Sequence, residues 1–212
     1  MSIIFFPAHF LYLKNNDNHN ELKKELLPKI LETKETIKDD KPFNACLFET
    51  SFDREELNKK IFFESEELKT MIWNNIENAI DIYNKNISYF QINIKKSIIT
   101  KIWYNMYNKG SNHFQEYHSH DSNPIIKDNK LYYPIFSGVY ILHDNNKVNN
   151  TIFKSYVSPF SNTRHNIIDT SNINNISEGT ILLFPSSLEH CVKPVLEDRV
   201  TIAFNIHSLF LN

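Results

Sequence analysis

The apolar and polar positions of this chain follow two patterns, which change over near residue 88. Before this point, apolar residues recur at the spacing of a helix, about 3.6 residues per turn. After it, they alternate with polar residues, as in a strand that is buried on one face. Helices followed by strands, with no regular alternation of the two, favour a mainly antiparallel β structure with helices covering one side.

Two helices are predicted in the first part of the chain. Residues 20–38 carry apolar side chains at helical spacing, and Pro28 is expected to break or kink this helix because it has no N–H to donate. In residues 65–85 the pattern is stronger, since Ser65 can cap the helix and two glutamates occupy its first turn. The apolar stripe of this second helix consists of Leu68, Ile72, Ile76, Ala79, Ile80 and Tyr83.

Strands are predicted in the second part. The stretch "KIWYNMY", residues 101–107, places Trp103, Asn105 and Tyr107 on one face. Further strands are expected at "SGVYIL", "GTILLF" and "RVTIAFNI", whereas the Asn- and Ser-rich segment 161–177 is expected to be a loop. The apolar start of the chain, "MSIIFFPAHFLYL", predicts an early strand.

Composition and charge narrow the class of protein. A chain of 212 residues with 41% hydrophobic residues can form one packed domain, and a net charge of −2 without a dense basic cluster argues against strong binding to a nucleic-acid backbone. Cys46 and Cys191 are too few for a disulfide framework. The N-terminal apolar run lacks a basic flank and is too short to span a bilayer. We therefore expect a cytoplasmic protein without a membrane partner.

The stretch "QEYHSH" contains the first candidate chemistry, His118 and His120. In an extended segment, residues two apart project from the same face, roughly 6.6 Å apart. Two imidazoles at this distance can share a metal ion if a third ligand arrives from elsewhere, and His190 at the end of "FPSSLEH" is the candidate. Taken alone, the two histidines would also fit an ordinary surface loop.

A second candidate is the polar face of "RVTIAFNI". Arg199, Thr201, Ala203 and Asn205 share this face, and the apolar residues between them take the other. A guanidinium binds a carboxylate through two parallel hydrogen bonds, and a neighbouring hydroxyl adds another donor. This face therefore predicts a pocket for an anion, although a solvent-facing strand would explain Arg199 alone.

Together these stretches resemble the 2-oxoglutarate- and Fe(II)-dependent oxygenases, in particular a group common in marine phages and bacteria. The matching stretches, in order, are "WYNMYNKG", "QEYHSH", "SGVY", "FPSSLEH" and "RVTIAFN", and they lie within residues 101–206. Each motif is weak alone, but five in the same order are a strong signal. The resemblance implies a double-stranded β-helix, or jelly roll. We expect a single oxygenase domain over 1–212, with the N-terminal strand and supporting helices in 1–88 and the jelly-roll core in 89–212.

The resemblance also implies a role for particular residues. His118, His120 and His190 would hold Fe(II), Arg199 would bind the distal carboxylate of 2-oxoglutarate, and Thr201 would assist it. A looser match implies that Asn105 and Tyr107 contact the same co-substrate. The reaction implied is hydroxylation of a C–H bond with O2, releasing succinate and CO2. Its substrate would be a peptide or a small molecule; the oligomeric state is left open.

The sequence departs from the usual oxygenase pattern at one ligand. The superfamily's first motif places a carboxylate two residues after the first histidine, whereas this chain has His120 there and Asp121 next. We favour three histidine ligands, as in the group named above, because Asp121 would point to the opposite face of a strand. The segment 121–136 is longer than expected and could form a substrate lid.

Two other classes of function remain open on the sequence. A cupin-type metal protein, an isomerase or a dioxygenase that uses no 2-oxoglutarate, would fit the spacing of Gly179, Pro185 and His190. That alternative leaves Arg199 and Thr201 without a role and lacks the glutamate of the first cupin motif. A metal-free jelly-roll binding module is the third class. The remaining histidines, including His113, His143, His165 and His207, show no partner pattern and are expected to be structural or exposed.

Overall fold

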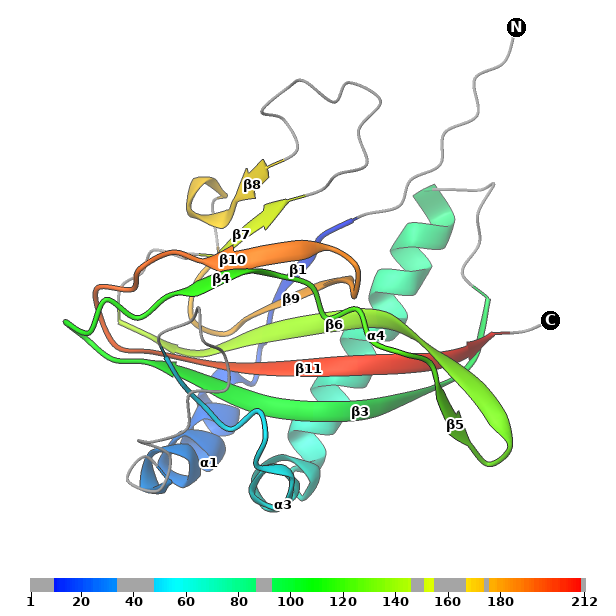
Figure 1. Cartoon of the computed structure of the whole chain (residues 1–212), viewed down its shortest axis with the longest axis horizontal. Helices are drawn as coiled ribbons and strands as arrows, with labels where there is room; N and C mark the ends of the chain where they lie inside the picture. The colour runs from blue at the N-terminus through cyan, green and yellow to red at the C-terminus, as the bar shows by residue number, and fades with distance from the viewer. Residues whose placement is uncertain are drawn as a thin grey trace, which may run out of the picture.

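Two antiparallel sheets form the centre of the protein (Figure 1). The computed structural model describes residues 10–33, 48–86, 93–145, 151–154, 167–173 and 176–210. The larger sheet has the order β1-β9-β6-β11-β3-β2, with β5 added to β6, and the smaller sheet has the order β4-β10-β7-β8. The strands of the larger sheet are β1 (Tyr12–Asn15), β2 (Glu49–Thr50), β3 (Ile94–Tyr107), β5 (Ile125–Lys127), β6 (Lys130–Asp144), β9 (Thr180–Pro185) and β11 (Arg199–Phe210). Those of the smaller sheet are β4 (Gln115–His118), β7 (Thr151–Lys154), β8 (Ile167–Asp169) and β10 (Glu189–Val192).

The helices lie on the outer face of the larger sheet. They are α1 (His19–Glu32), α3 (Glu55–Asn58), the π-helix η1 (Lys59–Phe63) and α4 (Glu66–Asn86); a short 3-10 helix, η3, covers Thr170–Asn172. The helix predicted at 65–85 is confirmed, and the Oγ of Ser65 accepts a hydrogen bond from the N–H of Leu68 at 3.3 Å. The break predicted at Pro28 is wrong, because α1 continues past it to Glu32. Burial of Leu22, Leu26 and Ile30 on the α1 face towards the sheet outweighs the missing hydrogen bond at Pro28.

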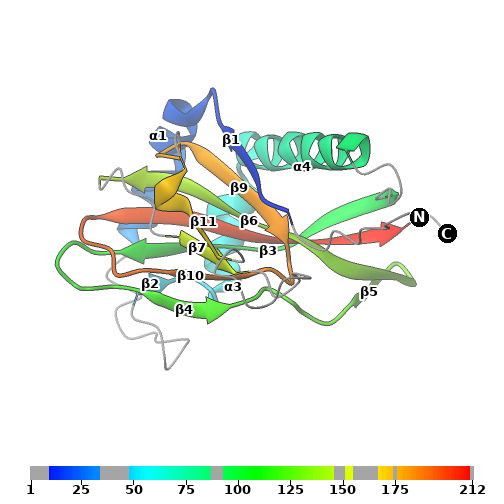
Figure 2. The same cartoon turned by 90° about the horizontal axis from the view of Figure 1, so that it is seen from above.

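Two apolar layers separate these elements. The helix-side core joins α1, η1 and α4 to one face of β3, β6, β9 and β11. The inter-sheet core lies between the two sheets and includes Trp103, Phe153, Leu182 and Phe184. Figure 2 shows α1 and α4 on one side of the larger sheet, and β4 and β10 on the other. The polar site described below therefore lies between the sheets, away from the helices.

Strand β11 confirms the predicted alternation. Val200, Ile202, Phe204 and Ile206 point into the helix-side core, so the opposite face, with Arg199, is turned towards the smaller sheet. On the neighbouring strand β6, a Cβ atom added to Gly138 would lie 2.2 Å from the Cζ of Phe204. The glycine of "SGVY" is thus required because an aromatic ring of the next strand occupies the space of a side chain.

The ends and connections differ in part from the sequence-based expectations. Residues 1–9 lie outside the described residues, and the early strand is seen only as β1. The segment expected to be a loop at 161–177 contains β8 and η3 where it is described, so that prediction is wrong for 167–172. Residues 125–132 form a hairpin from β5 into β6, whose turn residues Asp128 and Asn129 both have positive φ, 51° and 55°.

The observed architecture is the mainly β, jelly-roll arrangement with flanking helices that the sequence predicted. The long strands β3, β6 and β11 belong to the larger sheet, on one side of the inter-sheet core, and the short strands β4, β7 and β10 belong to the smaller sheet, on the other side. Across the described ranges, no helix is long and apolar enough to cross a membrane.

Candidate metal centre and co-substrate pocket

The three histidines predicted as metal ligands lie together between the sheets. One ring nitrogen of each lies within 4.8 Å of those of the other two. His118 ends β4 directly opposite His190 on β10, where the two are antiparallel partners. The backbone N–H of His120 donates to the carbonyl oxygen of Ser186, at 2.9 Å, in the turn between β9 and β10. Strand pairing and this one hydrogen bond therefore bring together residues about seventy positions apart.

Hydrogen bonds at Nδ1 fix how the three imidazoles are turned. The Nδ1 of His118 lies 2.8 Å from the carbonyl oxygen of Glu116, and the Nδ1 of His190 lies 3.4 Å from that of Leu188. The Nδ1 of His120 lies 3.0 Å from the side-chain oxygen of Asn205. Because a carbonyl oxygen only accepts, each Nδ1 carries the proton. Each Nε2 therefore has the lone pair that a metal ion needs.

Burial keeps these imidazoles uncharged. Loss of solvation, followed by the neighbouring His118, lowers the pKa of His120 to about 3. Burial also lowers the pKa of His118, and lowers that of His190 well below its ordinary range. At neutral pH the cluster is thus in the deprotonated form in which histidine binds metals.

Aromatic rings surround the cluster on the inter-sheet side. The ring centroid of Trp103 lies 5.3 Å from that of His120, and those of Phe184 and Phe153 lie 4.9 Å and 5.6 Å from that of His190. Trp103 is 4% exposed and belongs to the inter-sheet core. These rings restrict water on one side of the cluster, while His118 and His120 are only half-buried and stay reachable from outside.

All seven residues proposed from the sequence line one cavity. They are His118, His120, His190, Arg199, Thr201, Asn105 and Tyr107. Its wall also includes Gln115 and Thr151, which the sequence analysis did not single out. The space between these side chains is about 10 Å³, which is room for about one water molecule. A dicarboxylate such as 2-oxoglutarate can enter only if side chains of the wall move.

Arg199 closes the far end of this cavity. Its side chain is 1% exposed, and its Nε lies 3.8 Å from a carboxylate oxygen of the equally buried Asp144 on β6. One terminal nitrogen donates to the Oγ1 of Thr151 at 3.2 Å, and the guanidinium lies 5.7 Å from the centre of the Tyr107 ring. Asp144 supplies the counter-charge that allows an arginine to be buried at this position.

Gln115 links the arginine end of the cavity to the histidines. Its amide nitrogen donates to the Nε2 of His118 at 3.1 Å, and its amide oxygen accepts from the hydroxyl of Tyr107 at 3.3 Å. Asn105, by contrast, accepts from the Oγ1 of Thr50 at 2.8 Å. The only sequence signal for Gln115 was its place at the start of "QEYHSH", three residues before the first histidine.

The remaining candidates lie apart from the cluster. Asp121 is exposed and is not in the histidine cluster. The Nδ1 of His143 lies 3.0 Å from a carboxylate oxygen of Glu178. His113 accepts a hydrogen bond from the N–H of Asn108, and His207 lies 2.9 Å from the Oγ1 of Thr100. His165 and Cys46 lie outside the described residues, and Cys191 is buried.

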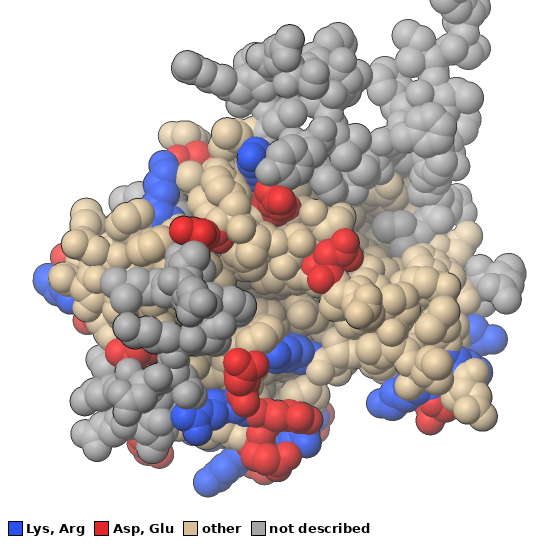
Figure 3. Space-filling model, viewed as in Figure 1, with Lys and Arg blue, Asp and Glu red and all other residues tan. Residues whose placement is uncertain are grey.

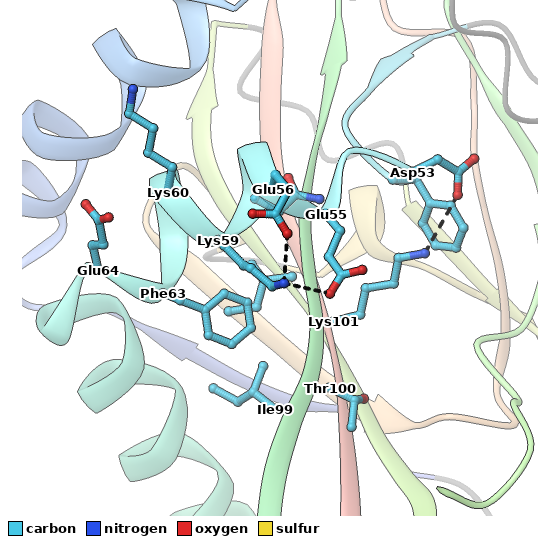
Figure 4. Close-up of a pocket in the computed structure, with 13 residues that line it drawn as sticks. Asp53, Glu55, Glu56, Lys59, Lys60, Phe63, Glu64, Ile99, Thr100 and Lys101 are labelled. Atoms are coloured by element: carbon cyan, nitrogen blue, oxygen red, sulfur yellow. Dashed lines mark hydrogen bonds and ion pairs between the residues drawn. The ribbon is translucent and has the colours of Figure 1, made fainter.

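A larger hollow of about 980 Å³ lies between α3, η1 and β3 (Figure 4). Five of its charged side chains form ion pairs with one another: Lys59 lies 3.0 Å from Glu55 and 2.9 Å from Glu56, and Lys101 lies 4.0 Å from Asp53. Among the described residues that line this hollow, none is a histidine. Acidic and basic side chains are interspersed over the face shown in Figure 3. The histidine cavity, although smaller, is the one with the chemistry of a site.

Comparison with solved structures places this arrangement in a known fold. A prolyl-4-hydroxylase from Pseudomonas putida matches with a TM-score of 0.54 at 11% identity, covering 97% of this chain and 95% of that one. The chain has the fold of the 2-oxoglutarate- and Fe(II)-dependent oxygenases.

Other structures with the oxygenase fold differ in what they bind. A prolyl hydroxylase from Trichoplax adhaerens, in complex with a peptide fragment of hypoxia inducible factor, matches with a TM-score of 0.53 at 15% identity, covering 94% of this chain and 83% of that one. HygX from Streptomyces hygroscopicus, with nickel and 2-oxoglutarate bound, matches with a TM-score of 0.54 at 12% identity, covering 95% and 84%. No protein-family model matches the sequence, and neither does any curated protein.

Proposed function

We propose that this protein is a 2-oxoglutarate- and Fe(II)-dependent dioxygenase that hydroxylates a C–H bond of a peptide or a small molecule. The observation that carries the proposal is the histidine cluster itself. Three imidazoles, each with its proton on Nδ1, converge in an oxygenase fold beside a buried arginine. We also propose that the whole chain forms one such domain and that it belongs to the phage and marine-bacterial group whose motifs it resembles.

The residues of the cavity divide into two sets under this proposal. His118, His120 and His190 would hold the iron through Nε2, since their Nδ1 atoms are engaged elsewhere. Arg199 and Thr201 would bind the distal carboxylate of 2-oxoglutarate, and Asn105 and Tyr107 would contact the same co-substrate. Iron and 2-oxoglutarate, when bound together, supply with O2 the oxidising power that attacks an unactivated C–H bond. The chain itself orients the ligands and, through Trp103, Phe153 and Phe184, limits water.

The substrate is proposed from the site and from the comparisons together. A structural neighbour holds a peptide, and HygX has also been solved with hygromycin B bound. A substrate of either class would approach from the side on which His118 and His120 are half-buried. The hairpin at 125–132 follows soon after this pair of histidines, which supports the proposal that the segment 121–136 forms a substrate lid.

A cupin-type metal protein that uses no 2-oxoglutarate is the second candidate, and two observations favour it. Asp144 already supplies a carboxylate near Arg199, and the space between the side chains is only about 10 Å³. Against it, Arg199 and Thr201 line the same cavity as the histidines, where the oxygenase proposal needs a guanidinium and a hydroxyl to bind the co-substrate carboxylate. Direct measurement of 2-oxoglutarate binding separates the two candidates.

Anaerobic titration of Fe(II), and then 2-oxoglutarate, into the metal-free protein tests the proposal. We expect a weak visible charge-transfer band when both are present, and succinate on admission of O2 with a substrate. Iron binding without the band would favour the cupin-type protein. Failure to bind any divalent metal would contradict both candidates and favour a metal-free binding module.

Variants at Arg199 give the control for the co-substrate. Arg199→Lys keeps the charge but loses the forked donor, so we expect weaker 2-oxoglutarate binding and unchanged Fe(II) binding. The double variant Arg199→Gln with Asp144→Asn removes both charges together, which avoids a buried carboxylate left beside a neutral partner. We expect no charge-transfer band in the double variant. A band as strong as that of the wild type would exclude Arg199 from the co-substrate site.

A further inference from the structure

His120 stands where the oxygenase pattern usually has a carboxylate, and its environment differs from that of the other two histidines. His118 and His190 donate from Nδ1 to backbone carbonyl oxygens close by in sequence. His120 donates to the side chain of Asn205, which lies 85 residues further along on β11. Of the three histidines in the cluster, His120 is therefore the one whose Nδ1 donates to a side-chain oxygen rather than to a backbone carbonyl oxygen.

The amide oxygen of Asn205 is used twice. It accepts from the Nδ1 of His120 at 3.0 Å and from the Oγ of Ser137 at 3.0 Å. The Oγ of Ser137 also lies 3.1 Å from that of Ser186, whose carbonyl oxygen accepts the backbone N–H of His120. These contacts tie His120 to β11, to β6 and to the turn that leads to His190. The ring and the backbone of His120 are thus both held in place without a metal ion.

We infer that Asn205 is the positioning residue of this metal centre: its side-chain oxygen holds the His120 ring with the proton on Nδ1, which leaves Nε2 free to bind a metal. This inference rests on the proposed function, since it concerns the same metal. A carboxylate in place of Asn205 would make the imidazole more basic and more electron-donating. The amide oxygen of Asn205 orients the ring without making it as basic or as electron-donating as a carboxylate would. The hydrogen bonds that the structure describes for His120 go to the side-chain oxygen of Asn205 and to the carbonyl oxygen of Ser186, and neither acceptor is a carboxylate.

The alternative orientation of the amide makes the inference testable. If the amide nitrogen faced the ring, it would donate to Nδ1, the proton would move to Nε2, and His120 could not bind a metal through that atom. Two-dimensional 15N NMR of the histidine rings in the wild-type, metal-free protein distinguishes the two forms. We expect His120 as the Nδ1–H tautomer; the Nε2–H tautomer would overturn the inference.

Metal affinity of the variants is the second test. Asn205→Ala removes the acceptor, and we expect Co(II) and Fe(II) to bind about 10- to 100-fold more weakly. Asn205→Asp keeps an acceptor and should bind to within a few-fold of the wild type. Because the carboxylate makes His120 a stronger donor, we also expect a lower Fe(III)/Fe(II) midpoint potential in Asn205→Asp than in the wild type.

The matched control is Asn58→Ala. Asn58 is 3% exposed and accepts a hydrogen bond from the Oγ of Ser51 at 2.6 Å, outside the histidine cavity. We expect this variant to lower the melting temperature without changing metal affinity. Wild-type affinity in a folded Asn205→Ala, or no rescue by Asn205→Asp, would overturn the inference. A correct tautomer in a protein that binds no metal would instead contradict the proposed function, so the two failures are distinguishable.

Discussion

At the scale of single residues, the hydrogen bond at the Nδ1 of each imidazole decides whether its Nε2 can bind a metal ion. Three histidines close together could equally be a hydrogen-bonded core. Here each Nδ1 is engaged by an oxygen, which leaves the Nε2 atoms available. His118 is the exception in part, because the amide nitrogen of Gln115 lies 3.1 Å from its Nε2. A metal ion must displace this amide before His118 can become a ligand.

Replacing Gln115 with alanine should therefore strengthen metal binding. The hydrogen bond to be broken is worth about 0.5–1.5 kcal/mol, so we expect Gln115→Ala to bind Co(II) about 2- to 10-fold more tightly than the wild type. Competition against a chelating dye of known affinity measures this. As a control, Tyr107→Phe removes only the hydroxyl that orients the amide and should have a smaller effect. Weaker binding in Gln115→Ala would mean that the amide helps to hold the metal.

At the scale of elements, a carboxylate joins α1 to the larger sheet. Glu178, just before β9, accepts from His19 at 3.0 Å and from Lys23 at 2.5 Å, both on α1. It also accepts from the backbone N–H of Asp144 at 2.9 Å. Burial alone would raise the pKa of Glu178, but these hydrogen bonds outweigh it and lower the pKa to about 2. The helix that the sequence predicted is thus anchored by a residue that the sequence did not single out.

Substituting Glu178 should destabilise the protein in a pH-dependent way. Because the folded-state pKa lies below the ordinary value of 4.5, the carboxylate stabilises the fold above about pH 4.5, and this contribution is lost as the pH falls towards 2. We expect Glu178→Gln to cost about 1–2 kcal/mol at pH 7, after allowing for solvent screening of a partly exposed group.

Denaturant unfolding at several pH values measures this cost. The difference between Glu178→Gln and the wild type should shrink as the pH is lowered from about 4.5. Glu56→Gln is the control, because Glu56 pairs with Lys59 on the surface and should contribute little at any pH. A cost that did not change between pH 7 and pH 3 would contradict an ionised Glu178 as the anchor.

At the scale of the whole molecule, a bound metal would join segments far apart in the chain. His118 ends β4, His190 lies on β10, and His120 is bonded to Asn205 on β11. A ligand that binds only the folded state at about 100 times its Kd stabilises that state by about 2.7 kcal/mol. For a chain of this size we expect the melting temperature to rise by about 5–10 °C.

Thermal unfolding with and without Co(II) tests this expectation. His190→Ala should remove the metal-dependent rise. His113→Ala is the matched control, since His113 is 8% exposed and accepts a hydrogen bond from the N–H of Asn108 outside the cluster. That variant should lower the melting temperature yet keep the rise. If the melting temperature of His190→Ala rose as much with Co(II) as that of the wild type, the metal would have to bind elsewhere.

The fold could be predicted from the sequence because its signals are local. The alternation of Val200, Ile202 and Phe204 with Arg199 and Thr201 identifies the two faces of β11, and the structure confirms it. Pro28 was misjudged because a local rule for helix interiors ignores the burial of the helix face around it. The segment 167–172 was misjudged because polar composition does not reveal that β8 pairs with β7.

The sequence by itself determined which residues could form the site: their spacing within single strands fixes which side chains share a face. Only the tertiary structure decided which strands meet, and hence that His118 pairs with His190, that Asn205 orients His120 and that Asp144 lies beside Arg199. These contacts join positions 55 to 85 residues apart, and no local periodicity encodes them, because they depend on which strands pair and on how the two sheets pack across a shared core.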